Sequence, residues 1–273
     1  MKKIKIGAIA LATAGVFALA SCSTETSKSS TSEVKTSTAA VTTSTTEAKT
    51  STTAEFHSVD SEGTLSYSEF VKTEDGNTVT FDAYIQGKTT WYNNAASFYL
   101  ADDNGAYYVY NLPCTEEDFK TKLVEGANIK VTGYKTSWKG QVEVMGNQAG
   151  EEGTYEVLSG THIYDAKKVD TLAALVNYPN QLIALDNLTV TEDAKYGWDG
   201  SGKASAGQDI YFSVTDGTTT YSFVLEAYLT TTQFGSDIYT TVSNLKKDDK
   251  ISLEGFAYTY NDPQVQVTKV VKK

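Results

Sequence analysis

The clearest pattern along the chain is an alternation of apolar and polar side chains over residues 123–146. Ile129 and Val131 alternate with Lys130 and Thr132, and after a polar turn a second alternating run covers residues 141–144. Successive side chains of a strand point to opposite faces of the sheet, so this alternation predicts a half-buried strand, a turn and a returning strand.

The same pattern returns near the C-terminus. Leu123 and Gly133 are ten residues apart, and so are Leu245 and Gly255 in the second copy. Three further strands are predicted before each copy, at 78–86, 97–101 and 107–112, and at 182–190, 210–214 and 221–225. Helical spacing predicts a helix between the third and fourth strand of each set. The first of these helices begins at residue 115, and the second covers residues 234–245. This duplication predicts two domains of one plan, at residues 56–155 and 161–273.

A short helix is also expected near the start of each domain. In the first domain it covers residues 66–72. In the second, Asp170 is expected to cap a helix that carries Leu172, Leu175 and Val176, because a side-chain oxygen at that position accepts a hydrogen bond from the first turn.

Residues 1–22 have the pattern of a lipoprotein signal peptide. Three lysines within the first five residues precede an apolar run over 6–19, and the segment ends in Leu-Ala-Ser-Cys. This ending resembles the bacterial lipobox, which implies a lipid attached to Cys22 and a protein held at the outer face of the cell membrane. A plain secretory peptide or a single membrane-spanning anchor is the alternative, although the apolar run is short for a span.

Residues 23–55 are expected to be a disordered tether. Serine and threonine make up 20 of these 33 residues. Such a segment cannot bury enough apolar surface to offset the entropy lost on ordering.

The two predicted domains resemble the OB-fold, a small five-stranded barrel. The resemblance lies in FYLADDNGAYYVY with LVEGANIKVTG, and in IYFSVTDGTTTYSFV with LKKDDKISLEG. It implies an all-β protein made of two tandem OB-fold-like barrels, each with a short helix between strands three and four. The two domains resemble in particular bacterial extracytoplasmic OB-fold modules. Another small antiparallel barrel or sandwich stays open as an alternative.

OB-folds bind ligands at the face of strands two and three, between the first-to-second and fourth-to-fifth strand loops. On that plan Trp91, Trp138 and Trp198 all fall on ligand loops, accompanied by tyrosines. Aromatic rings stack on sugars, bases or partner side chains. The expected ligand-binding residues are therefore Trp91, Tyr92, Trp138, Trp198, Tyr258 and Tyr260, with cross-strand packing of each ring as the alternative.

Charge bears on the choice of partner. The formal charge is −11, and all 23 basic residues are lysines. An acidic chain without arginine lacks the usual driving force for contact with phosphates, which disfavours nucleic acid and favours a glycan or an envelope protein. A structural envelope component without a small ligand is the second reading. Capture of single-stranded nucleic acid is the third, with Lys88, Lys135 and Lys139 as the candidates for a basic cleft.

Signals of catalysis and of cofactors are weak. The two histidines, His57 and His162, lie at domain edges, and Cys114 has no histidine near it in the sequence. The loop at 192–207 carries Asp199 but lacks the regular acidic spacing of a calcium loop. We therefore expect a binding protein that is not an enzyme, with no cofactor and no metal.

Overall fold

The computed structural model describes residues 63–148 and 150–273. These residues belong to one compact unit by their contacts. The predicted signal peptide, the lipidation site at Cys22 and the tether at 23–55 lie outside the described residues. Within the described part of the chain, no helix has the length and apolar character needed to span a membrane.

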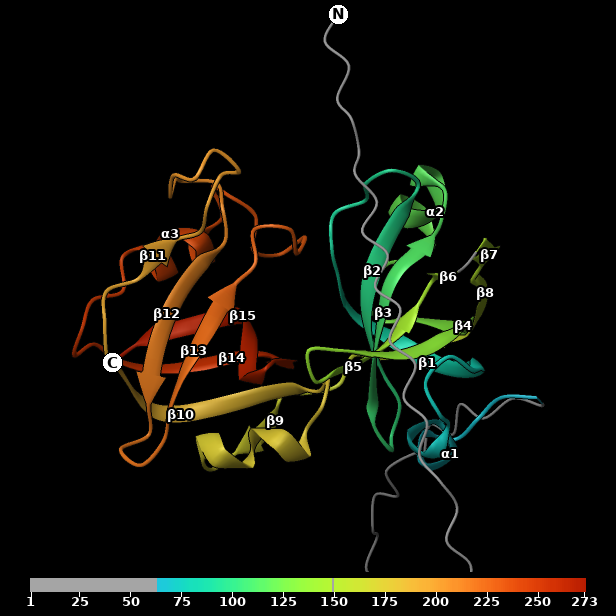
Figure 1. The fold of residues 1–273 in the computed structure, drawn as a ribbon, viewed down its shortest axis with the longest axis horizontal. Coiled ribbons are helices and arrows are strands. Elements are labelled where there is room, and N and C mark those ends of the chain that lie inside the picture. Colours follow the sequence, from blue (N-terminus) through green and yellow to red (C-terminus); the bar gives the residue numbers. More distant parts are fainter. Residues whose placement is uncertain (1–62, 149) are drawn as a thin grey trace, which may run out of the picture. The chain divides into compact units, whose positions relative to one another are not determined.

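The N-terminal sheet has the strand order β1-β2-β3-β5-β4-β8. An additional pairing of β1 with β4 closes the first five of these strands into a barrel (Figure 1). Neighbouring strands are antiparallel except β3 and β5, which are parallel. The strands are β1 (Thr78–Lys88), β2 (Ala95–Ala101), β3 (Ala106–Pro113), β4 (Ala127–Trp138), β5 (Gln141–Met145) and β8 (Thr154–Thr161).

Two short helices and a small hairpin complete this part: α1 (Tyr67–Lys72), α2 (Glu116–Thr121), β6 (Asn147–Gln148) and β7 (Glu151–Glu152). Helix α2 begins after Thr115, whose hydroxyl accepts a hydrogen bond from the backbone N–H of Asp118 at 3.0 Å, as an N-cap residue does. The barrel interior is filled by buried apolar side chains, among them Phe81 stacked on Tyr107 with ring centroids 4.0 Å apart.

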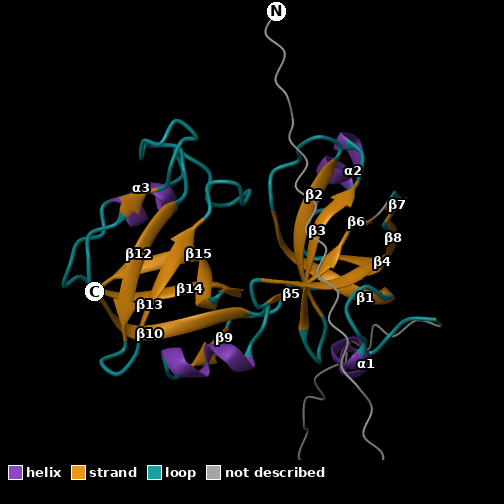
Figure 2. Cartoon of the chain, in the orientation of Figure 1, coloured by secondary structure: helices purple, strands orange, loops and turns teal. Residues whose placement is uncertain are grey.

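The C-terminal sheet has the strand order β11-β12-β13-β15-β14-β10-β9. Strand β10 also pairs with β12, at Thr189 with Thr215 and Val190 with Val214. Its elements are β9 (Lys167–Val169), the 3-10 helix η1 (Leu172–Asn177), β10 (Leu182–Val190), β11 (Lys195–Tyr196), β12 (Ile210–Thr215), β13 (Thr220–Leu225), α3 (Asp237–Ser243), β14 (Lys250–Tyr260) and β15 (Asp262–Lys272). Strands dominate the described residues, as Figure 2 shows.

The predicted β-rich chain with a five-stranded barrel is confirmed, while two local expectations are wrong and edge strands of the two sheets were not predicted. Asp170 does not cap η1: the N-cap is Thr171, and the Leu172 N–H donates to the carboxylate of Asp216 instead. Phe234 precedes α3 and is 65% exposed, so it does not belong to the buried face of that helix. Strands β8 and β9, which extend the two sheets, were not expected.

Candidate functional site

The outer face of β2 and β3, where an OB-like domain is expected to bind its ligand, is covered in the N-terminal sheet. Tyr99 of β2 stacks on Phe256 of β14, with ring centroids 4.0 Å apart and nearly parallel planes. The Tyr99 hydroxyl donates to the side chain of Gln266. Leu229 and Tyr108 are buried in the same cluster. This face therefore packs against the C-terminal sheet and is closed to ligands.

The predicted residues of the β4–β5 and β14–β15 turns lie near this contact. The backbone N–H of Asn261 donates to the Lys139 carbonyl at 2.7 Å, which ties the two turns together. Trp138 is 56% exposed and Tyr260 is 45% exposed. Tyr258 is partly buried and meets the ring of Tyr108 edge-on, with centroids 6.5 Å apart.

Lys88 and Lys135, two of the three candidates for a basic cleft, bind backbone carbonyls within the fold. Lys88 Nζ donates to the carbonyls of Phe119 and Leu123, at 2.7 and 2.8 Å, where helix α2 ends. Lys135 Nζ donates to the carbonyl of Val71 at 2.9 Å, near the end of α1. A cation at the C-terminus of a helix satisfies free carbonyls and the helix dipole. These two lysines therefore stabilise helix ends and do not form a basic groove.

Trp91 and Tyr92 take different roles within the β1–β2 loop. The Trp91 indole N–H donates to the Cys114 carbonyl at 3.0 Å, and its ring packs on the barrel core. Tyr92 is 82% exposed. Both border an open groove of ≈ 1090 Å³. Its other lining residues include asparagines and carboxylates: Asn93, Asn94, Asn111, Glu116, Asn147 and Glu152.

Trp198 lies in a second, separate pocket of ≈ 540 Å³ on the C-terminal sheet. Its indole is 72% exposed, and Tyr196 and Tyr211 line the same pocket with exposed fractions of 37% and 44%. Asp209 and Gln208 add polar groups, and burial raises the pKa of Asp209. We call the rings of Tyr196, Trp198 and Tyr211 the aromatic platform.

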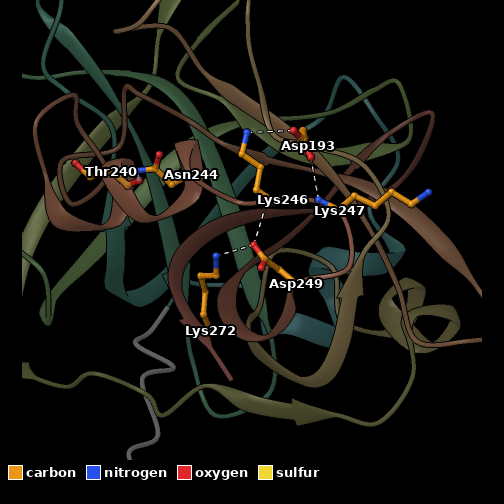
Figure 3. A network of polar contacts seen from close by, with 7 residues as sticks. All are labelled: Asp193, Thr240, Asn244, Lys246, Lys247, Asp249 and Lys272. Carbon is orange, nitrogen blue, oxygen red and sulfur yellow. Dashed lines mark hydrogen bonds and ion pairs between the residues drawn. The ribbon is translucent and has the colours of Figure 1, made fainter.

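The long loop that carries the platform is fixed at both ends. At its far end, the Tyr239 hydroxyl accepts from the Gly207 N–H at 2.8 Å and donates to the Gln208 carbonyl at 2.6 Å. At its start, Asp193 accepts from the ammonium of Lys246 and from the backbone N–H of Lys247, both at 3.0 Å (Figure 3). These bonds hold the rings in place before any ligand arrives, which lowers the entropy cost of binding.

The acidic residues of this loop already have partners. Asp193 binds the two lysines just named. Asp199 Oδ1 accepts from the backbone N–H of Ser201 at 2.8 Å, a tight turn closed by its own side chain. Groups of three or more metal-ligating side chains are absent from the described residues.

The six predicted ligand residues thus fall in three places. Trp91 and Tyr92 border the groove, Trp198 belongs to the platform, and the other three lie at the paired turns. Sequence reasoning missed the asparagines of the groove and the part played by Tyr211. The WYNNAA stretch carried a signal for the asparagines, because Asn-Asn favours a tight hairpin turn. Tyr211 had a signal as well: Ile210, Phe212 and Val214 alternate along the predicted strand, which places Tyr211 on its outer face.

No protein-family model and no curated protein matches this sequence. Solved structures do match, and they are HIN-type and other OB-fold-like domains. A HINa domain in complex with 20-base-pair double-stranded DNA is 16% identical, with a TM-score of 0.34 and coverage of 72% of this chain and 98% of that one. A murine DNA-binding protein bound to double-stranded DNA is 13% identical, with a TM-score of 0.34 and coverage of 71% and 99%.

A replication protein A heterotrimer bound to single-stranded DNA also matches. It is 12% identical, with a TM-score of 0.28, and the match covers 72% of this chain and 49% of that one. At these identities and TM-scores, the functional residues of the matched proteins have no assigned counterparts in this chain.

The comparisons contradict the expectation that nucleic acid is a disfavoured partner, because the matched structures include complexes with double- and single-stranded DNA. The physical reason lies in what net charge measures. It is a sum over the whole chain, whereas stacking of bases on aromatic rings depends on the local surface. Charge alone therefore does not exclude nucleic acid for this fold.

Proposed function

We propose that this chain is a non-enzymatic binding protein that holds an extended ligand by stacking its rings on the aromatic platform. One observation carries the proposal: three rings, one of them 72% exposed, border one pocket, two of them on a loop fixed at both ends and the third, Tyr211, on β12. Large aromatic side chains in a soluble protein are usually buried. Their exposure on a rigid loop is the arrangement that ligand-binding sites require.

The ligand that fits the platform best is a glycan. Sugar rings present flat C–H faces that stack on aromatic rings, and hydroxyls that donate to carboxylates and amides. Asp209 and Gln208 supply such acceptors beside the rings. A phosphate placed near Asp209 would instead meet a like charge whenever that carboxyl is ionised.

Single-stranded nucleic acid is the second candidate. Bases stack on the same rings, and Lys195 lines the platform pocket with Lys203 a few residues further along the loop. These lysines supply the local positive charge that a nucleic-acid ligand needs.

We further propose that both sheets are OB-like barrels in tandem, and that the lipobox and tether hold them outside the cell membrane through lipid on Cys22. The correspondence of strand order supports the first point. The charged and apolar pattern of residues 1–22 supports the second. Replacement of Cys22 by Ser is expected to abolish incorporation of labelled palmitate and to release the protein from the membrane fraction.

The chemistry of the nucleophilic candidates supports a role other than catalysis. Cys114 is buried, and burial raises the pKa of its thiol to about 11, so the reactive thiolate is scarce at neutral pH. The ring of His162 packs edge-on against Tyr164, with centroids 4.3 Å apart.

A combined glycan and oligonucleotide array, probed with the full-length chain in a zwitterionic detergent free of sugar groups, tests the proposal. We expect binding to a subset of glycans, weakened about tenfold or more by Trp198→Ala, since loss of one stacked ring typically costs that much. Tyr228→Ala removes a ring that is 56% exposed and lies outside both cavities, and it serves as the control. A flat array, or equal binding by both variants, would refute the platform and favour a structural envelope role.

A further inference from the structure

We infer that the groove beside Trp91 and Tyr92 is a second ligand site, built for an uncharged saccharide. This inference rests on the proposed function and extends it, because the groove and the platform share no lining residue. At ≈ 1090 Å³ the groove is about twice the volume of the platform pocket. It lies on the N-terminal sheet, whose expected ligand face is closed by the sheet contact.

The groove has a rigid rim. Tyr92 and Ala95 exchange backbone hydrogen bonds of 2.9 and 3.1 Å around a two-residue turn. Asn93 and Asn94 form this turn with φ of 51° and 60°, the left-handed conformation of a tight hairpin. The Asn94 carbonyl accepts from the Cys114 N–H at 3.0 Å, which fixes the turn to the end of β3.

The lining chemistry selects for hydroxyl groups. Four asparagines line the groove together with Tyr92: Asn93, Asn94, Asn111 and Asn147. An amide both donates and accepts, so it matches the alternating donor and acceptor character of sugar hydroxyls. Glu116 and Glu152 add acceptors only.

Charge narrows the ligand class further. Among the described residues, Glu116 and Glu152 are the only charged ones that line the groove, and no lysine is part of its lining. Glu116 is paired with Lys120 at 2.5 Å, but both side chains are exposed and the pair is screened. An anionic glycan or a phosphate backbone would meet two carboxylates here, of which only Glu116 has a lysine partner, and that partner is exposed. An uncharged glycan meets hydrogen-bonding groups, aromatic rings and a few apolar side chains, with no like charge to oppose it.

The chain contains three tryptophans, which allows each cavity to be observed alone. In the full-length chain carrying Trp138→Phe and Trp198→Ala, Trp91 is the only tryptophan, and the most exposed ring of the platform is removed. This variant is titrated in the same detergent with three neutral probes (chitohexaose, cellohexaose and maltohexaose), with a hyaluronan hexasaccharide as the anionic probe and with a thymidine oligonucleotide.

We expect a saturable change in Trp91 emission with at least one neutral probe and at least tenfold weaker binding of the two anionic probes. Adding Tyr92→Ala should weaken that binding about tenfold, and adding Asn94→Gly should weaken it several-fold. The glycine keeps the left-handed turn while removing the amide, so a loss cannot arise from a broken hairpin. Adding Tyr228→Ala should leave the affinity unchanged.

Two results would overturn the inference. The first is an unchanged Trp91 signal with every neutral probe, and the second is tighter binding of an anionic probe. If the chain with Trp198 intact still binds its array glycan in a Trp198-dependent way, the proposed function survives and only the groove fails. If that binding is also absent, both fail together.

Discussion

Single residues decide how closely the two sheets approach. A Cβ at Gly87 of β1 would lie 2.7 Å from the ring of Phe256 on β14, closer than carbon atoms pack. We expect Gly87→Ala to lower the free energy of unfolding by about 1–3 kcal/mol through overpacking. Urea denaturation measures this loss in the free energy of unfolding. Combining Gly87→Ala with Phe256→Ala should recover part of the loss relative to the sum of the two single changes, and strict additivity would contradict the contact.

Two carboxyl groups near the sheet contact make stability depend on pH. Burial raises the pKa of Glu143 to about 7. Burial, with a smaller contribution from the charge of Asp209, raises the pKa of Glu226 to about 8. Both carboxyl groups have a higher pKa in the folded protein than in the unfolded chain. Their contribution to the free energy of unfolding is therefore fully present below about pH 4.5 and is lost as the pH rises through 7 to 8.

We therefore expect the urea concentration at the unfolding midpoint to decrease as the pH is raised from 6 to 9. We expect this decrease to be smaller in Glu143→Gln. The amide keeps the shape of the side chain but carries no charge. The Glu143 contribution is at most about 3 kcal/mol. Glu254→Gln, on an exposed salt bridge with Lys269, is the control and should leave the pH profile unchanged. A wild-type midpoint that rises with pH over this range would show that the carboxyls are not desolvated.

At the scale of elements, alternation identified the principal strands because each has one face in a barrel core. Ile129 and Val131 of β4 are fully buried, and their neighbours Lys130 and Thr132 are partly exposed. Strand β8 escaped prediction because its side chains are mostly exposed, so the sequence carries no apolar period there. The cap of η1 was misassigned because its partner, Asp216, is distant in sequence.

The candidate sites were predicted only in part, because contacts between residues that are distant in the sequence decide which side chains are exposed. Strand order predicted the loop positions of Trp91 and Trp198, whereas Trp138, expected in the fourth-to-fifth strand loop, is the last residue of β4 and pairs with Gln141. Whether each ring is exposed depends on contacts made by distant residues: Trp91 turns inward to the Cys114 carbonyl, whereas Trp198 does not. The closed face at Tyr99 depends on Phe256, which lies more than a hundred residues away in the sequence.

The far end of the loop at 192–207 is held by the hydroxyl of Tyr239. Tyr239 bonds the Gly207 N–H and the Gln208 carbonyl, so Tyr239→Phe should loosen the loop while keeping the buried ring. We expect faster amide exchange at Gly207 and a few-fold loss of affinity for the platform ligand, since a net hydrogen bond contributes about 1 kcal/mol. Tyr221→Phe, in the same sheet, is the control. Unchanged exchange at Gly207 in Tyr239→Phe would show that the loop is held elsewhere.

For the described residues as a whole, the sheet contact predicts that the two sheets unfold together. The contact combines the stacked Tyr99 and Phe256 rings with hydrogen bonds from Tyr99 to Gln266 and from Gln141 to Asn180. Buried apolar area and satisfied polar groups of this kind couple neighbouring units.

This coupling is measurable with tryptophan fluorescence, because Trp91 reports on the N-terminal sheet and Trp198 on the C-terminal sheet. Chains in which Trp91 or Trp198 is the single remaining tryptophan, with Trp138 replaced by Phe in both, should show coincident urea transitions, as two-state unfolding requires. In the Phe256→Ala, Gln266→Ala background the stack and the hydrogen bond to Tyr99 are lost, and the two transitions should separate. Separate transitions without these substitutions would mean that each sheet is stable by itself and that the contact contributes little. Coincident transitions in the doubly substituted background would place the coupling at the Gln141–Asn180 bond and the paired turns instead.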